Sequence, residues 1–137
     1  MIDIENEIFT ELAQALRAEF PALSEPGNVT SVYVKAPSRF PHVSITESDN
    51  YMTRSRLDNG LVEKYSTLMY EVNVYSNRTS GKKAEAKEIM YFLDKLLYEH
   101  NFVRLSYSPV PNMEDATIYR IVARYSVETD GKNLYRI

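Results

Sequence analysis

The chain has 137 residues, a length that fits one domain with a real core. Its formal net charge of −3 argues against a dedicated nucleic-acid binder, and the absence of cysteine excludes disulfides, cysteine-ligated zinc and thiol catalysis. The opening MIDIENEIF lacks the basic region and apolar run of a signal peptide, and no apolar stretch approaches the roughly 20 residues that cross a bilayer. We therefore expect a soluble chain made in the cytosol.

An amphipathic helix is predicted over residues 2–20. Its apolar stripe recurs every four positions, at Ile4, Ile8, Leu12 and Leu16. Acidic residues in the first turns suit the positive end of the helix dipole. Pro21 ends the helix, because the residue before a proline is pushed out of the helical conformation.

Three strands are predicted next, over residues 29–35, 42–47 and 66–75. In the first, Val32 and Val34 share a face. The third has the clearest alternation, and its apolar face is formed by Leu68, Tyr70, Val72 and Val74. The polar segment 48–65 between the second and third strands is longer than the 2–5 residues typical of a hairpin connection, which favours a functional or disordered loop.

A second helix is predicted over residues 82–100, with Ser80 as its N-cap. Its buried stripe is formed by Ala86, Ile89, Met90, Leu93, Leu96 and Leu97. Two further strands are predicted over residues 102–107 and 117–127. In the last of them one face is formed by Tyr119, Ile121, Ala123, Tyr125 and Val127, and the other, only partly solvated, by Ile118, Arg120, Val122 and Arg124.

These elements predict an α+β fold in the order α-β-β-β-α-β-β. We expect a single domain over residues 1–137, with a mainly antiparallel sheet and two helices packed on one face. A long loop at about 48–65 and a strand-like C-terminal tail at 131–137 extend from it.

No catalytic arrangement is apparent in the sequence. The two histidines, His42 and His100, have no ligand-like spacing, and we interpret His42 as a solvent-facing or interface residue and His100 as a helix-end residue. The four glycines are scattered and form no phosphate-binding loop. We therefore expect no catalytic, cofactor-binding or metal-binding residues, no cofactor and no enzymatic activity.

An RNA-binding module is the alternative from a different class. The α-β-β-β-α order, the pair Pro41-His42 and the basic run Lys82-Lys83-Ala84-Glu85-Ala86-Lys87 resemble a double-stranded-RNA-binding domain. The loop at 48–65 is too long for that family, and the chain continues past His100 with two more predicted strands. A patch at Lys82, Lys83 and Lys87 undiluted by acids would favour RNA binding; lysines mixed with glutamates are typical of a solvated helix start.

Several segments together resemble a phage structural family. They are Tyr70-Glu-Val-Asn-Val-Tyr-Ser-Asn77 with residues 79–83 after it, Pro109-Val-Pro-Asn112 with Asp115-Ala-Thr-Ile-Tyr-Arg120, and Leu134-Tyr-Arg136. The chain is similar, over essentially its whole length, to tail-terminator or tail-completion proteins from the head–tail neck of long-tailed bacteriophages.

The resemblance implies a structural, non-enzymatic virion protein with a tail-terminator-like fold. Such proteins form a ring, generally a hexamer, that caps the tail tube and joins it to the head. The implied partners are further copies of the chain, the tail tube protein, the head–tail connector or stopper protein and, where a sheath is present, the tail sheath. DNA would only pass through the lumen of the ring. A head-side adaptor or stopper in the same neck is the closest alternative.

Two segments are candidates for contacts within such an assembly. Residues 50–63, with Arg54 and Arg56 against Asp58 and Glu63, are predicted to project toward the lumen or the tube. The tail residues Leu134, Tyr135 and Arg136 are predicted to contact a neighbouring subunit, since a free strand can add to the edge of a neighbour's sheet. A disordered loop and a frayed terminus are the simpler alternatives.

Overall fold

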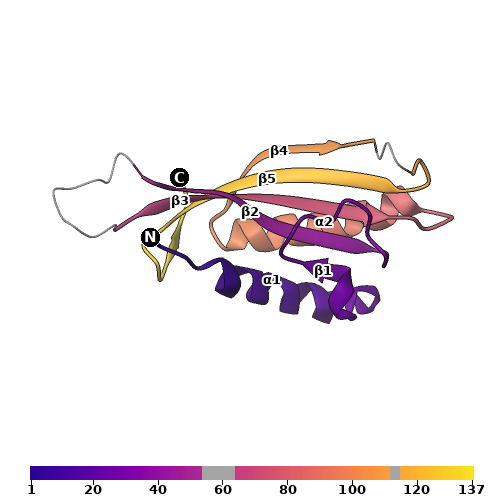
Figure 1. Cartoon of the computed structure of the whole chain (residues 1–137), viewed down its shortest axis with the longest axis horizontal. Coiled ribbons are helices and arrows are strands. Elements are labelled where there is room, and N and C mark those ends of the chain that lie inside the picture. The colour runs from indigo at the N-terminus through magenta and orange to yellow at the C-terminus, as the bar shows by residue number, and fades with distance from the viewer. Residues whose placement is uncertain (54–63, 112–114) are drawn as a thin grey trace.

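The computed structural model of the chain describes residues 1–53, 64–111 and 115–137 (Figure 1). The helical elements are α1 (Glu5–Glu19), η1 (Pro21–Leu23), η2 (Pro26–Asn28) and α2 (Lys82–Glu99). The strands are β1 (Val29–Thr30), β2 (His42–Met52), β3 (Ser66–Ser76), β4 (Val103–Pro109), β5 (Tyr119–Thr129) and β6 (Leu134–Tyr135).

One mixed sheet contains all the described strands. Its order is β1-β2-β3-β5-β4, and β6 pairs with the end of β5. The β1–β2 pair is parallel and the other pairs are antiparallel. The α+β prediction for a single domain is therefore confirmed at the level of fold class. The predicted order was incomplete, because it lacked β6 and did not anticipate the parallel pair.

The core lies between the helices and one face of the sheet. The predicted alternations in β3 and β5 are confirmed: Leu68, Tyr70, Val72, Val74, Ile121, Ala123, Tyr125 and Val127 are all buried. They join Leu12 and Leu16 of α1 and Met90, Leu93 and Leu97 of α2 in a single cluster. Both helices therefore cover the same face, and Figure 1 shows α1 running along the lower side of the sheet.

The first predicted strand was too long. Only Val29 and Thr30 pair with β2, and Val32 is 62% exposed. The Thr30 hydroxyl donates a hydrogen bond to the Val32 carbonyl, which turns the chain out of the sheet plane. The segment then approaches β3, where the Tyr75 hydroxyl donates to the Val34 carbonyl. The alternation of Val32 and Val34 predicts a strand, but after the turn these residues form no backbone pairs with β2.

The second predicted strand was too short. β2 continues through Met52, which pairs with Ser66, and its register shifts by a bulge between Glu47 and Asp49. The segment 48–65 is thus not all loop. The polar sequence after Glu47 shows no alternation typical of a strand. Pairing with β3 nevertheless satisfies the backbone hydrogen bonds there, whatever the side chains are.

The predicted helix boundaries needed smaller corrections. The N-cap of α2 is Gly81, with φ 81° and no side-chain capping bond, so the assignment of Ser80 as the cap was wrong. The left-handed conformation there favours glycine. α1 begins at Glu5, whose amide donates to the Asp3 carboxylate. At the other end of the sheet, β4 extends to Pro109, at an edge position where the missing amide hydrogen costs no ladder bond.

Candidate interaction surface

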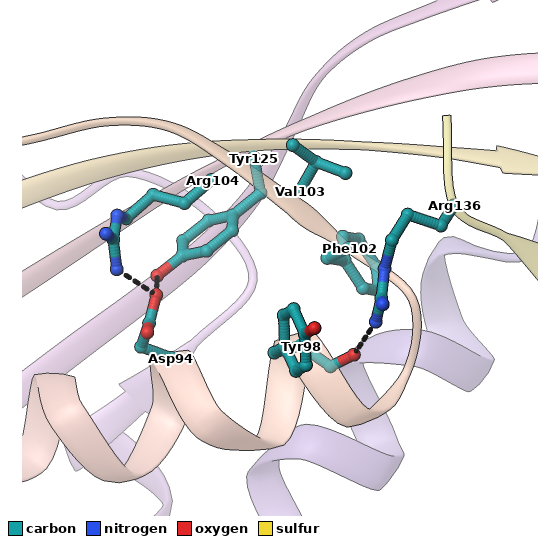
Figure 2. Close-up of a pocket in the computed structure, with 7 residues that line it drawn as sticks. All are labelled: Asp94, Tyr98, Phe102, Val103, Arg104, Tyr125 and Arg136. Carbon is teal, nitrogen blue, oxygen red and sulfur yellow. Dashed lines mark hydrogen bonds and ion pairs between the residues drawn. The ribbon is translucent and has the colours of Figure 1, made fainter.

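A groove between α2 and β4 is a concave surface on which several polar groups converge. It includes a cavity of about 300 Å³. The lining residues are Asp94, Tyr98, Phe102, Val103, Arg104, Tyr125 and Arg136 (Figure 2). We call this surface the α2/β4 groove.

The end of α2 brings β4 beside the helix. Asn101 has φ 71°, and the Phe102 amide donates to the Leu97 carbonyl, which closes the helix with a left-handed residue. Phe102 is buried edge-on against Tyr70, with ring centroids 5.6 Å apart. This anchor returns the chain along α2, so the first residues of β4 face the last turns of the helix.

Asp94 links three elements at the centre of the groove. Its Oδ1 atom accepts a hydrogen bond of 2.6 Å from the Tyr125 hydroxyl and one of 3.0 Å from Arg104 Nη1. Burial, followed by the bond to Asp94, raises the pKa of Tyr125 far above its ordinary value, so this phenol stays a donor. The Asp94 carboxylate also raises the pKa of Arg104. The three side chains therefore hold β4 and β5 against α2.

The C-terminal tail forms one wall of the groove. Arg136 Nη2 donates to the Tyr98 carbonyl at 2.6 Å, and its guanidinium carbon lies 4.0 Å from the centroid of the Tyr98 ring. The Leu134 carbonyl accepts from Asn101 Nδ2 at 2.9 Å. The tail residues that were predicted to meet a neighbour thus make contacts within their own chain, and whether they also meet a neighbour stays a prediction.

A turn at Asp130 positions this tail. The Asp130 carboxylate accepts backbone hydrogen bonds from Asn133 and Lys132 and a third from the Tyr135 hydroxyl, and these bonds lower its pKa. They bring Leu134 and Tyr135 into register with β5 as β6. The strand-like composition of the tail therefore corresponds to a real, short strand.

The outer side of the groove is exposed and aromatic. Tyr91 is 59% and Tyr98 61% exposed on α2, and Leu105 is 52% exposed on β4. A second cavity of about 190 Å³ continues the groove toward Tyr91 and Tyr107. Sequence reasoning missed this surface, although the spacing of Tyr91, Lys95 and Tyr98 places all three on one stripe of a helix.

The edge of β4 is open along this surface. The Val110 amide donates to the Arg120 carbonyl, and hydrogen-bonded pairs alternate along an antiparallel ladder. The backbone groups of Ser106 and Ser108 therefore face β5, and those of Tyr107 face outward. No described strand pairs with this outer side. An open edge beside an aromatic groove is a surface suited to binding another chain.

The remaining predicted residues are placed as follows. Arg54, Arg56, Asp58 and Glu63 lie outside the described residues. Lys82 donates to the Thr117 carbonyl, and Glu85 lies in the same helical turn, bonded to Ser76 and 3.8 Å from Arg78. A carboxylate, Glu85, thus lies among the lysines at the start of α2.

Both histidines make hydrogen-bond contacts with other parts of the chain. His42 was expected to face solvent or an interface, but it is buried and its Nδ1 lies 3.1 Å from the Gly27 carbonyl. The segment after β1 covers the face of the sheet on which the His42 side chain lies. His100 ends α2 as predicted, with Nδ1 2.8 Å from the Leu96 carbonyl and Nε2 2.8 Å from Glu11.

Within residues 1–53, 64–111 and 115–137, no cluster of three or more histidine, aspartate or glutamate side chains is arranged to hold a metal ion. In the same ranges, no helix is both long enough and apolar enough to cross a membrane. Known protein families offer no model that matches the chain, and no curated protein matches it in sequence.

Proposed function

We propose that this chain is a structural, non-enzymatic protein of the bacteriophage neck. It acts as a tail terminator: a ring of copies, generally six, caps the tail tube and joins it to the head. Its partners are further copies of itself, the tail tube protein, the head–tail connector or stopper and, in contractile particles, the tail sheath. The proposal rests on the family resemblance of the sequence together with one observation on the fold.

That observation is the presence of two unlike exposed edges on one sheet. At one edge, β4 presents outward backbone groups beside the aromatic α2/β4 groove. At the other edge, β1 pairs with β2 only at Val43 and Ser44, and Tyr51 and Met52 are exposed farther along β2. A closed ring of identical subunits needs two different, complementary patches on each subunit, and this arrangement supplies candidates for both.

A head-side adaptor or stopper of the same neck is the second candidate. It would use the same two edges to form a ring, so the partner decides between the two roles. A terminator binds the end of a tail tube, whereas a stopper or adaptor binds the head side and lies on the DNA channel. A double-stranded-RNA-binding role is a more distant candidate, because Glu85 lies among the lysines at the start of α2.

The test is electron microscopy of the protein mixed with purified tails and, separately, with DNA-filled heads. We expect a six-fold ring at the head-proximal end of the tube and no density on heads. Binding to heads alone would reassign the chain to the head side of the neck. Binding to neither particle would refute the neck proposal, and duplex RNA binding would then be measured.

A deletion variant extends the test to the segment predicted to contact the tube. Removal of residues 54–60 should leave the chain folded and abolish capping. Capping at the level of the unmodified chain would show that this segment is not needed for it. The control is substitution of Asp115, an exposed residue of another loop, by Asn.

A further inference from the structure

The lining of the α2/β4 groove contains two cations and one carboxylate. Lys95 lies outside this lining, exposed on the stripe of α2 that carries Tyr91 and Tyr98, and Glu99 follows it one turn later. Arg104 and Arg136 line the groove from β4 and from the tail. The lining includes a single carboxylate, Asp94, which is already bonded to Arg104 and Tyr125. Lys95 and Arg136 have no carboxylate partner among the described residues.

Exposed tyrosine beside arginine is the composition that interface centres favour. These side chains bury a large area at low entropy cost and combine apolar contact with hydrogen bonding. Tyr98 is already stacked with Arg136, so its ring is held in place before any partner arrives. A partner of this groove should therefore bring negative charge together with an extended or apolar segment.

Such a surface exists on the opposite edge of the same molecule. Asp3, Glu5 and Glu47 lie together where the start of α1 meets β2, and we call them the acidic cluster. Burial raises the pKa of Glu47, the Tyr70 hydroxyl bond lowers it, and the charges of Glu5 and Asp3 raise it further. No described cation forms an ion pair with any of the three, so the cluster keeps a net negative charge.

The geometry allows the two surfaces of different copies to meet. β2 and β4 lie toward opposite edges of the sheet, as the strand order shows. Tyr70 and Tyr125 lie on the helix-covered face of the sheet. Glu47 is the cross-strand neighbour of Tyr70, and Arg104 is the cross-strand neighbour of Tyr125, so both charged residues lie on that face as well. Asn50 Nδ2 donates to the Ile2 carbonyl, which fixes the N-terminal residues beside the end of β2 (Figure 1). Two copies placed side by side with the same orientation would bring one groove toward one acidic cluster.

We propose that the α2/β4 groove receives the acidic cluster of a second copy of this chain. The proposal rests on the ring assembly proposed above and names the surfaces that form it. The contact is head to tail, so each copy uses its groove for one neighbour and its cluster for the other. Because both surfaces are charged and at least partly exposed, association should weaken as salt is raised.

Charge reversal tests this contact. The groove variant carries Lys95→Glu and Arg136→Glu, and the cluster variant carries Asp3→Lys and Glu5→Lys. Each alone has two surfaces of like charge and should self-associate at least ~10-fold more weakly than the unmodified chain. An equimolar mixture should recover association, since each variant then offers the surface the other needs. Light scattering and sedimentation at low and high salt measure the masses.

Controls separate this contact from general charge effects and from misfolding. Arg39→Glu with Lys83→Glu produces the same change in net charge at exposed positions outside the groove lining and away from the start of α1. This control should associate like the unmodified chain. Thermal unfolding checks that each variant is folded. Lys95→Glu alone serves as a second variant beside the groove, because Arg136 also holds the tail through its bond to the Tyr98 carbonyl.

Cross-linking detects association too weak for mass measurements. The chain has no cysteine, so the single variants Asn6→Cys and Tyr91→Cys, at exposed positions that leave the charges of both surfaces intact, are labelled uniquely by a short bismaleimide. A mixture of the two should give mainly the mixed dimer. Dimers of each variant alone, no product above that of the unfolded chain, or failure of the charge-swapped mixture to recover would each overturn the proposal.

The outcomes also separate this inference from the proposed function. Rings that cap tails but tolerate both charge reversals would sustain the terminator proposal and refute the groove–cluster contact. Recovery in the charge-swapped mixture without any binding to tails or heads would establish the contact and refute the neck function.

Discussion

Tyr125→Phe tests whether the Asp94 link holds β4 and β5 against α2. The substitution removes only the hydroxyl that donates to Asp94 at 2.6 Å from a residue that is 1% exposed. A hydrogen bond to a charged group contributes about 1.5–3 kcal/mol. The Asp94 side chain is 31% exposed and keeps its bond to Arg104, so water and Arg104 compensate part of the loss. We expect the free energy of unfolding to fall by about 1–2 kcal/mol.

Urea unfolding followed by circular dichroism measures this change. The midpoint should fall with the slope unchanged, and the melting temperature should drop by about 3–8 °C for a domain of this size. The matched control is Tyr98→Phe, which removes the same hydroxyl from a ring that is 61% exposed and should change stability by less than about 0.5 kcal/mol. Equal effects of the two substitutions would refute the role assigned to the Asp94 link.

Three further perturbations have defined outcomes. Burial lowers the pKa of His42, so the folded state binds fewer protons than the unfolded state, and the free energy of unfolding should fall as the pH drops below about 6.5. His42→Asn should reduce this loss of stability at acid pH, measured by urea unfolding between pH 5 and 7. Burial alone would lower the pKa of His100, but its bonds to Leu96 and Glu11 outweigh this effect and raise the pKa. The stability that His100 contributes is therefore present at acid pH and is lost as the pH rises through that pKa. Glu11→Gln should reduce this contribution, and an unchanged dependence of stability on pH would contradict the assignment. Leu93→Ala, at a fully buried position, should cost about 2–5 kcal/mol by denaturant unfolding, whereas Lys95→Ala two positions along the helix should be nearly neutral.

The groove needed the tertiary structure, because its parts come from distant places in the sequence. Tyr125 and Asp94 are 31 positions apart, and Arg136 and Tyr98 are 38 apart. The sequence placed Tyr125 on the buried face of its strand and Asp94 on the polar side of its helix. Nothing in either local pattern indicates that the two side chains meet. Their contact depends on the order of strands in the sheet and on the return of the chain after Asn101.

Two boundaries show how tertiary contacts override local pattern. Val32 and Val34 alternate like strand residues, yet β1 ends at Thr30 because the chain turns out of the sheet. Residues 48–52 have no apolar alternation, yet they form the end of β2 because β3 offers backbone partners there. Propensity is a weak preference in strands, and pairing decides the outcome.

The sequence by itself determined the core-facing side of α1, α2, β3 and β5. The 3.6-residue period of α1 and α2 and the two-residue period of β3 and β5 follow from the geometry of single elements, so the faces with Leu12, Leu93, Val72 and Ala123 could be recognised locally. Only the tertiary structure decided which elements are neighbours, and with them the groove, the acidic cluster and the open edge of β4. Contacts between distant residues leave no periodic signal in the chain, so they became visible only once the sheet was assembled.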